Sequence, residues 1–290
     1  MIINLTSSAS NGSASMMVSK PKPKAGRTIR VRIKRCEGPG KAERVETFNV
    51  KTETGANIIS ALMQIAGNPV TVEGTKTTPV VWDSGCLEEV CGACTMVVNG
   101  KVRQSCSALL DDIAPNEGDE ISLEPMSKFP VIRDLWVDRS RIFNGLKRVK
   151  AWVPVDGTYN LGAGPKEKPD HQDTRYKLST CMSCGCCMEA CPQFNQIPDQ
   201  GSKQANEAAF NSAFIGAHAI SQARLFNMHE TGKQLKAERL DALSAPGGVS
   251  DCGNAQNCVK VCPKKIPLTE SIAAIGRAVT LHNITKFFTR

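Results

Sequence analysis

Residues 181–192 read CMSCGCCMEACP and carry five cysteines in eleven positions before the proline. The whole chain has 290 residues and 13 cysteines, most of them in tight runs of this kind. The N-terminal residues lack the apolar core of a secretory signal, so we do not expect export to an oxidising compartment. Because disulfides are rare in proteins that are not exported, the runs predict metal binding instead.

Four of the five cysteines follow the spacing C-x2-C-x2-C-x3-C-P, which binds iron–sulfur clusters in bacterial ferredoxins. They are Cys181, Cys184, Cys187 and Cys191, the last one standing before the proline. In that motif the first three thiolates bind one cluster and the fourth binds a second cluster. Cys186 is left over beside a ligand, so we expect it to be a small apolar filler.

A second run, DCGNAQNCVKVCPKKIP at 251–267, repeats the spacing with one gap, because Ala255 stands in the second cysteine's place. In this motif the fourth cysteine of each run binds the cluster of the other run. The motif therefore predicts a [4Fe–4S] cluster bound by Cys181, Cys184, Cys187 and Cys262. The other cluster is left with Cys191, Cys252 and Cys258. Alanine cannot bind iron, so three thiolates predict [3Fe–4S]; the alternative is a fourth iron completed by water or hydroxide.

An earlier group of cysteines has a different spacing. Cys86, Cys91 and Cys94 form C-x4-C-x2-C, and Cys106 follows after a short interval. This is the plant-type ferredoxin spacing for a [2Fe–2S] cluster, with glycines at 85 and 92 allowing a close backbone approach. The alternative is a zinc site, but four-cysteine zinc sites usually come as two C-x2-C pairs. Cys36 and Cys186 are then the two cysteines without iron.

The segment from residue 27 to residue 135 reads as a small β-rich domain crossed by one helix. Residues 27–35 and 44–52 alternate apolar and polar side chains around a turn-forming EGPGK, which predicts a hairpin. Helical spacing covers 57–66, and Asn99-Gly100 predicts a second hairpin within 95–104. Residues 119–124 read as a further strand.

The remainder reads as helical, which makes the chain α+β. We expect a connecting segment at 136–173, whose residues 154–173 form a loop rich in Pro, Gly and Asp, and a helical domain at 174–290. One long helix is predicted over 204–228 and a last helix from about Thr269. Apolar residues of the last helix, Phe287 among them, are expected to pack in the core. Residues 1–26 contain no acid and predict a disordered tail, with an organellar transit peptide as the alternative.

Composition argues against several classes of function. The net charge of +8 is scattered along the chain, which favours a solvated basic surface over a nucleic-acid-binding tract. No stretch approaches the ~20 apolar residues of a membrane-spanning helix. No catalytic Ser/His/Asp set or nucleotide-binding loop is present, so we expect no catalytic residue. Surface or core roles are expected for the four histidines: His171, His218, His229 and His282.

With these motifs, the chain resembles the iron–sulfur subunit of succinate dehydrogenase and fumarate reductase. Beyond the cysteines, the resemblance rests on FPVIRDLWVD (129–138), SQARLFN (221–227) and CGNAQNCVKVCPKKIPLTESIA (252–273). It implies a plant-type ferredoxin (β-grasp) domain followed by a helical domain with a split bacterial-type two-cluster core. It further implies electron flow from FAD in a partner flavoprotein through [2Fe–2S], [4Fe–4S] and [3Fe–4S] to a membrane quinone.

Asn195, Gln196 and Gly253 depart from the ubiquinone-reducing members, which have a tryptophan pair and often a histidine at these places. In this respect the chain is similar to the menaquinone-linked type. That similarity implies a dihaem cytochrome b anchor, which holds the haem b, and a peripheral position on the cytoplasmic face of the bacterial inner membrane. The alternatives are the same subunit in a fumarate reductase, a subunit of another flavin-linked oxidoreductase, and a zinc-structured nucleic-acid-binding module.

Overall fold

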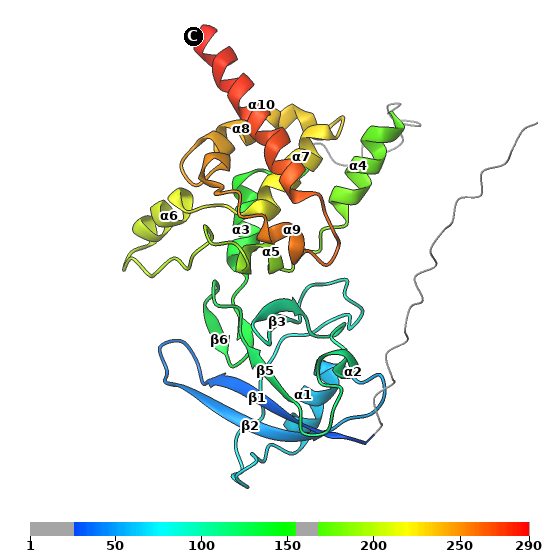
Figure 1. The fold of residues 1–290 in the computed structure, drawn as a ribbon. Coiled ribbons are helices and arrows are strands. Elements are labelled where there is room, and N and C mark those ends of the chain that lie inside the picture. Colours follow the sequence, from blue (N-terminus) through cyan, green and yellow to red (C-terminus); the bar gives the residue numbers. More distant parts are fainter. Residues whose placement is uncertain (1–25, 155–167, 290) are drawn as a thin grey trace, which may run out of the picture.

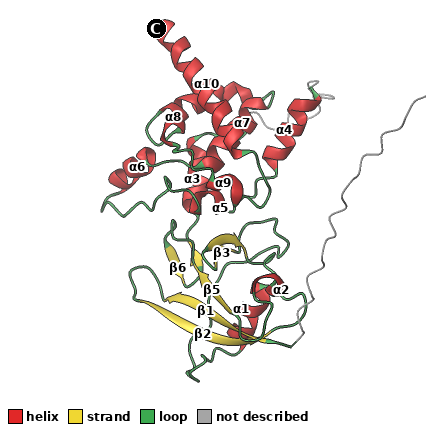
Figure 2. Ribbon diagram, viewed as in Figure 1, coloured by secondary structure: helices red, strands yellow, loops and turns green. Residues whose placement is uncertain are grey.

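The computed structural model describes residues 26–154 and 168–289. A sheet-containing part and a helical part follow one another along the chain and lie end to end (Figures 1 and 2). The predicted α+β class is therefore confirmed. The predicted disordered tail lies outside the described residues except at its last position.

A five-stranded sheet forms the first part, with the strand order β2-β1-β5-β3-β4. Both predicted hairpins are present, because β1 pairs with β2 and β3 pairs with β4 in antiparallel register. The central β5 runs parallel to β1 and antiparallel to β3. The strand bounds are β1 Thr28–Cys36, β2 Glu43–Lys51, β3 Thr95–Val98, β4 Lys101–Gln104 and β5 Glu120–Glu124.

One helix packs on this sheet. It is α1 (Ile58–Gly67), which begins where the side chain of Asn57 accepts a hydrogen bond from the amide of Ser60. Its apolar stripe, including Leu62, packs on the alternate residues of β1 that point to the same side, such as Val31. A short α2 (Leu110–Ile113) follows β4. The helix predicted at 57–66 is thus confirmed.

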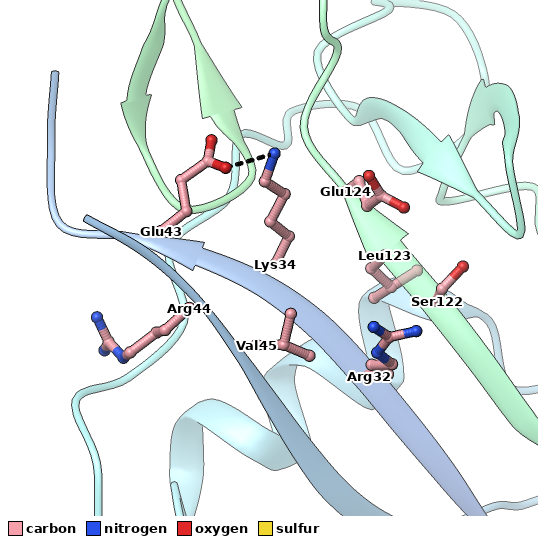
Figure 3. Close-up of a pocket in the computed structure, with 8 residues that line it drawn as sticks. All are labelled: Arg32, Lys34, Glu43, Arg44, Val45, Ser122, Leu123 and Glu124. Atoms are coloured by element: carbon pink, nitrogen blue, oxygen red, sulfur yellow. Dashed lines mark ion pairs between the residues drawn. The ribbon is translucent and has the colours of Figure 1, made fainter. Parts of the chain in front are cut away.

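The opposite face of the sheet carries charges of both signs. Arg32 and Lys34 on β1 lie between Glu43 on β2 and Glu124 on β5, around a shallow open pocket (Figure 3). Lys34 pairs with Glu43 at 2.8 Å. Mixed charge keeps this face solvated.

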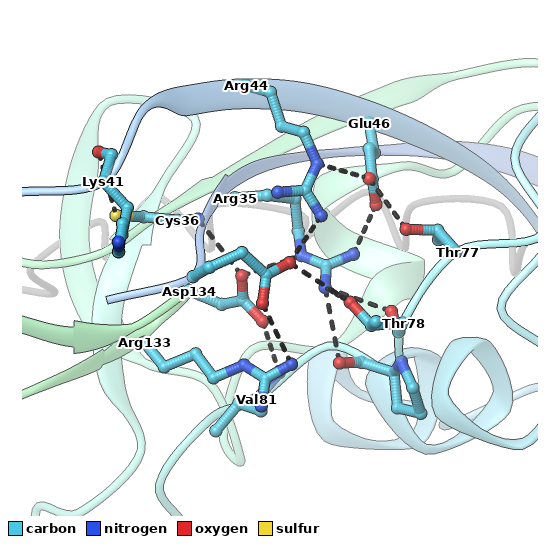
Figure 4. A network of polar contacts seen from close by, with 12 residues as sticks. Arg35, Cys36, Lys41, Arg44, Glu46, Thr77, Thr78, Val81, Arg133 and Asp134 are labelled. Carbon is cyan, nitrogen blue, oxygen red and sulfur yellow. Dashed lines mark hydrogen bonds and ion pairs between the residues drawn. The ribbon is translucent and has the colours of Figure 1, made fainter. Parts of the chain in front are cut away.

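A buried ionic network holds the end of β1 to the segment that leads into the cysteine loop (Figure 4). Arg35 donates to Asp134 at 2.9 Å, and both side chains are fully buried. Asp134 also accepts from the backbone amides of Cys36 at 3.1 Å and Val81 at 3.0 Å. Arg35 further contacts Glu46 and the carbonyl of Thr78. The network therefore fixes residues 78–81, just before the first cysteine group.

The chain then passes into the helical part. A small hairpin of β6 (Val131–Arg133) and β7 (Trp136–Val137) leads to α3 (Ser140–Arg148). The helices that follow surround a second core, in which α7 packs against α3, α4, α5, α8 and α10. Their bounds are α4 Pro169–Ser179, α5 Cys186–Glu189, α6 Lys203–Ser212, α7 Ala217–Met228, η1 Gly232–Leu235, α8 Lys236–Ser244, η2 Val249–Asp251, α9 Asn257–Lys260 and α10 Leu268–Phe288.

Three sequence predictions are wrong here. The single helix expected over 204–228 is two helices, because Ala213 is extended and Gly216 has a φ of 90° between α6 and α7. The loop expected to reach 173 ends earlier, since α4 starts with Pro169 at its first turn. Phe287 is 77% exposed instead of packed, because the last turns of α10 project beyond the core (Figure 1). The last helix itself begins within one residue of its predicted start.

Among the helices at residues 26–154 and 168–289, none combines the length and the apolar character that a membrane span requires.

Candidate metal centres

Residues 86–94 form a tight loop whose backbone amides point at cysteine sulfurs. The Sγ of Cys86 accepts from the amides of Glu88 at 3.4 Å and of Val90 and Cys91 at 3.3 Å. Leu87 and Glu89 make this possible with φ values of 61° and 55°. The amide hydrogen bonds, that of Glu88 first, lower the pKa of Cys86 to about 7. A loop that stabilises thiolates in this way fits an iron–sulfur cluster.

The other two cysteines of this group lie behind the loop. Cys94 precedes β3 and Cys106 follows β4, so the Asn99-Gly100 hairpin brings them together. Both are buried, and burial raises the pKa of Cys94 to about 12, with a further contribution from Cys106. The Sγ of Cys106 accepts from the amide of Glu89 at 3.3 Å, which ties it to the loop. The structure thus brings the four predicted [2Fe–2S] ligands to one place.

A cavity in the helical part is lined by the four cysteines predicted to hold [4Fe–4S], which are Cys181, Cys184, Cys187 and Cys262. Cys186, which is predicted to hold no iron, lines the same cavity. Burial raises the pKa of Cys187, and the neighbouring thiols, that of Cys184 foremost, raise it further. A group of thiols that repel one another's charge in a buried cavity requires cations to hold them as thiolates. The donor set and the cavity therefore fit the cluster.

The three cysteines predicted for the last cluster also gather. Burial raises the pKa of Cys258, and the thiols of Cys191 and Cys252 add to the effect. Cys258 lies on α9, which packs against α5, the helix that carries Cys187. Ala255 lies on the loop between Cys252 and Cys258.

The two bacterial-type runs have matching backbones. Cys184 stands between Ser183 and Gly185, whose φ values are 51° and 88°. Ala255 stands between Asn254 and Gln256, whose φ values are 52° and 59°. A short helix follows each of these loops directly, α5 in the first run and α9 in the second. Ala255 therefore occupies the backbone position that a cysteine occupies in the first run.

Each of the two leftover cysteines has a hydrogen-bond partner in the protein. Cys36 donates its thiol to the carbonyl of Gly38 at 3.0 Å. Cys186 is 1% exposed and accepts from the side-chain amide of Gln104 at 3.4 Å. A hydrogen bond with Cys184 raises the pKa of Cys186, so it stays a neutral thiol. That neither cysteine binds iron stays a prediction.

The cysteine loops of the two parts touch. A β-carbon built on Gly92 would lie 2.7 Å from the Cα of Cys184. Arg139 donates to the carbonyl of Gly92 at 2.6 Å and to Asp83 at 3.2 Å, so it clamps the first loop at this contact. The first cluster site thus adjoins the second.

Sequence reasoning missed one residue at the second site. His218, near the start of α7, lines the same cavity as the four cysteines and is 3% exposed. Burial lowers the pKa of its imidazole to about 4. No metal-ligand spacing links it to the cysteines, so the sequence holds no signal for this placement.

Across residues 26–154 and 168–289, no three His, Cys, Asp or Glu side chains converge closely enough to hold a single metal ion.

Two family models match the chain in the same order as its parts. Residues 30–144 match a 2Fe-2S iron-sulfur cluster binding domain, and residues 177–266 match a 4Fe-4S dicluster domain. The succinate dehydrogenase iron-sulfur subunit of Bacillus subtilis is 51% identical over 262 residues, covering 90% of this chain and 96% of the relative.

The chain belongs to the family of succinate dehydrogenase and fumarate reductase iron–sulfur subunits. It is an iron–sulfur electron-transfer subunit with a 2Fe–2S domain and a 4Fe–4S dicluster domain. A fumarate reductase iron-sulfur subunit of Mycobacterium tuberculosis in this family is 30% identical and covers 69% of this chain and 74% of its own length. The solved Mycobacterium smegmatis Sdh1 complex in the apo form shares the fold, with a TM-score of 0.67 at 18% identity over 88% of this chain and 96% of that chain.

Proposed function

We propose that the chain serves a succinate dehydrogenase and carries electrons from FAD in a partner flavoprotein through [2Fe–2S], [4Fe–4S] and [3Fe–4S] to a membrane quinone. The proposed ligands are the three cysteine sets described above. The observation that carries the proposal is the contact of these sets in chain order. Gly92 touches Cys184 between the first and second sets. Between the second and third sets, α5, which carries Cys187, packs against α9, which carries Cys258.

Bound clusters supply one-electron carriers, and the chain's own residues set their surroundings. The amides that surround Cys86 stabilise negative charge on its sulfur. Arg139 adds positive charge at the meeting point of the first two loops. Among the proposed ligands of the helical part, Cys184 and Cys258 are buried and the other thiols are half-buried, which limits the access of water and lowers the local dielectric. Together these features favour transfer within the protein over loss of electrons to solvent.

The direction of succinate oxidation is supported by the comparisons. Identity is 51% to the Bacillus subtilis succinate dehydrogenase subunit, against 28% and 30% to fumarate reductase subunits of Wolinella succinogenes and Mycobacterium tuberculosis. The proposed route and direction follow the relative with the higher identity.

We further propose menaquinone as the acceptor and a dihaem cytochrome b as the anchor, on the cytoplasmic face of a bacterial inner membrane. This choice is supported by the polar residues Asn195 and Gln196, which stand where the ubiquinone-reducing members have the tryptophan pair. Asn195 accepts from Lys128 at 3.2 Å, and Gln196 donates to the carbonyl of Ser127 at 2.5 Å. Held in this way, neither side chain offers the aromatic surface that the ubiquinone-reducing members have there.

The test is purification of the intact complex under anaerobic conditions. We expect FAD, haem b and the iron and sulfide of one [2Fe–2S], one [4Fe–4S] and one [3Fe–4S] cluster, with succinate reducing the clusters and then a menaquinone analogue. Zinc in place of iron, or iron without any reduction by succinate, would overturn the proposal.

A further inference from the structure

Within the described chain, the imidazole of His218 is the one aromatic ring that lines the cavity of the second cysteine set. Its Nε2 lies 3.0 Å from the hydroxyl oxygen of Ser183, the residue before Cys184. Its Nδ1 is fully buried and has no hydrogen-bond partner among residues 26–154 and 168–289. Leaving a buried polar atom without a hydrogen-bond partner costs about 1–3 kcal/mol of folding free energy. We therefore expect a partner that the described residues do not supply.

The tautomer follows from the two nitrogens. A neutral imidazole has one donor and one acceptor nitrogen, and burial keeps this ring neutral. When the Ser183 hydroxyl donates to Nε2, the proton resides on Nδ1, which becomes a free donor. The other residues that line the cavity are mostly cysteines and apolar residues such as Ile266 and Leu268, and Lys264 is the one charged residue among them. Sulfur carrying negative charge is the acceptor that this cavity offers.

We infer that His218 donates its free N–H to a sulfur of the cluster held by Cys181, Cys184, Cys187 and Cys262, and that Ser183 fixes the ring for this role. The inference rests on the proposed function, since it requires that cluster. His218 is a positioning and tuning residue and binds no iron.

The expected consequence concerns the reduction potential. Reduction adds negative charge to the cluster and its sulfurs, so a donor binds the reduced form more strongly than the oxidised form. The N–H of His218 therefore raises the potential of the second cluster. Because the imidazole is neutral, it does so without adding a positive charge that would need compensation in the buried site.

The test is a redox titration of the intact complex followed by electron paramagnetic resonance, after iron and sulfide contents have been measured. His218→Leu keeps the volume and removes the donor. We expect the equilibrium constant for reduction of the [4Fe–4S] cluster to fall about tenfold, which is about 59 mV for one electron. His218→Gln keeps an N–H donor and should stay near the wild-type potential. Ser183→Ala should give a smaller fall, because the ring loses its fixed tautomer.

The matched control is His282→Leu. His282 lies on α10, where its Nε2 pairs with Asp241 at 2.9 Å, and it lines no cysteine cavity of the described chain. In this variant the reduction potential of the [4Fe–4S] cluster should equal the wild-type value. Pulsed resonance on complex labelled with nitrogen-15 histidine should also show coupling to the reduced second cluster, and this coupling should vanish in His218→Leu.

Two results overturn the inference. One is an unchanged potential in His218→Leu with full iron and sulfide. The other is an equal shift in His218→Leu and His218→Gln, because packing alone would then explain both. If His218→Leu loses the cluster, two other measurements test the inference in its place. They are the potential of the cluster in Ser183→Ala and the histidine coupling in the wild-type complex. Absence of any [4Fe–4S] cluster in the wild-type complex would instead contradict the proposed function.

Discussion

Gly92 and Cys184 lie in direct backbone contact across the boundary between the sheet and the helical part. A β-carbon on Gly92 would lie 2.7 Å from the Cα of Cys184, 2.8 Å from its Cβ and 3.0 Å from the carbonyl oxygen of Met182. Gly92 also has a φ of 73°, which favours glycine by itself. The two cysteine loops can therefore approach this closely only because position 92 has no side chain.

Gly92→Ala should separate the two cysteine loops. The added β-carbon would meet atoms of the backbone and of Cys184, a proposed ligand, and these atoms cannot move aside without shifting the second loop. We expect the first cluster still to be reduced by succinate at its normal rate, while reduction of the second and third clusters slows at least tenfold. Freeze-quench electron paramagnetic resonance measures the clusters separately.

The control for this variant is Gly100→Ala, in the turn between β3 and β4. Gly100 has a φ of 72° and nothing within 4 Å of an added β-carbon. It carries the strain of a positive φ, about 1 kcal/mol, without the steric contact. Equal slowing in both alanine variants would show that strain, and not the contact, governs the rate.

Asp134→Asn should destabilise the sheet-containing part. The substitution keeps the shape of the side chain but removes its negative charge. Arg35 and two backbone amides donate hydrogen bonds to this carboxylate in a fully buried site. A hydrogen bond to a charged group contributes about 2 kcal/mol, and we expect a loss of about that size in the free energy of unfolding. Urea unfolding followed by circular dichroism measures it. Lys34→Ala, which removes a surface ion pair, should cost under about 1 kcal/mol.

The two leftover cysteines, Cys36 and Cys186, allow a prediction about iron content. Cys36→Ser and Cys186→Ser should leave iron and sulfide unchanged, because both thiols have protein partners. Cys187→Ser should damage the [4Fe–4S] cluster. Iron analysis of the three purified complexes checks this, and loss of iron in Cys186→Ser would mean that the ligand register of the first run is different.

Cys86 should be the most reactive thiol of the first loop in cluster-free protein. Its pKa of about 7 means that the reactive thiolate appears as the pH rises through neutrality, and its side chain is exposed. Cys94 has a pKa of about 12 and is buried, so it should stay unmodified over the same range. Iodoacetamide labelling from pH 5 to pH 9, followed by mass spectrometry, measures both. Labelling of Cys94 as fast as Cys86 would contradict the loop geometry.

The sequence allowed the sheet-forming hairpins and the three cysteine groups to be predicted, because both depend on local spacing. Alternation of side chains and Asn99-Gly100 are enough to specify the two hairpins. The break between α6 and α7 escaped prediction because the apolar stripe continues across it. The extended Ala213 and the positive φ of Gly216, where an added β-carbon would meet Met188, show that the chain turns there.

Contacts between distant segments were beyond sequence reasoning. The buried position of Arg35 depends on Asp134, which lies 99 residues away. Likewise, His218 comes to the cysteine cavity through the packing of α7 against α5 and α4. A charged or polar residue within an apolar pattern looks like a surface residue until its partner is known.

Ala255 bears directly on the central claim, that an incomplete ligand set defines the third cluster. Its backbone repeats that of Cys184, with left-handed residues on both sides and a short helix directly after the loop. A cysteine at this position is therefore expected to direct its thiolate as Cys184 does. The substitution adds one sulfur to an exposed loop, so folding should survive.

The most direct measurement is electron paramagnetic resonance of the oxidised complex, wild type beside Ala255→Cys. The account predicts a [3Fe–4S] signal in the wild type and its loss in Ala255→Cys, with a [4Fe–4S] signal appearing on reduction and slower quinone reduction by succinate. A wild type without the [3Fe–4S] signal, or an Ala255→Cys variant that keeps it with the new thiol free, would contradict the account.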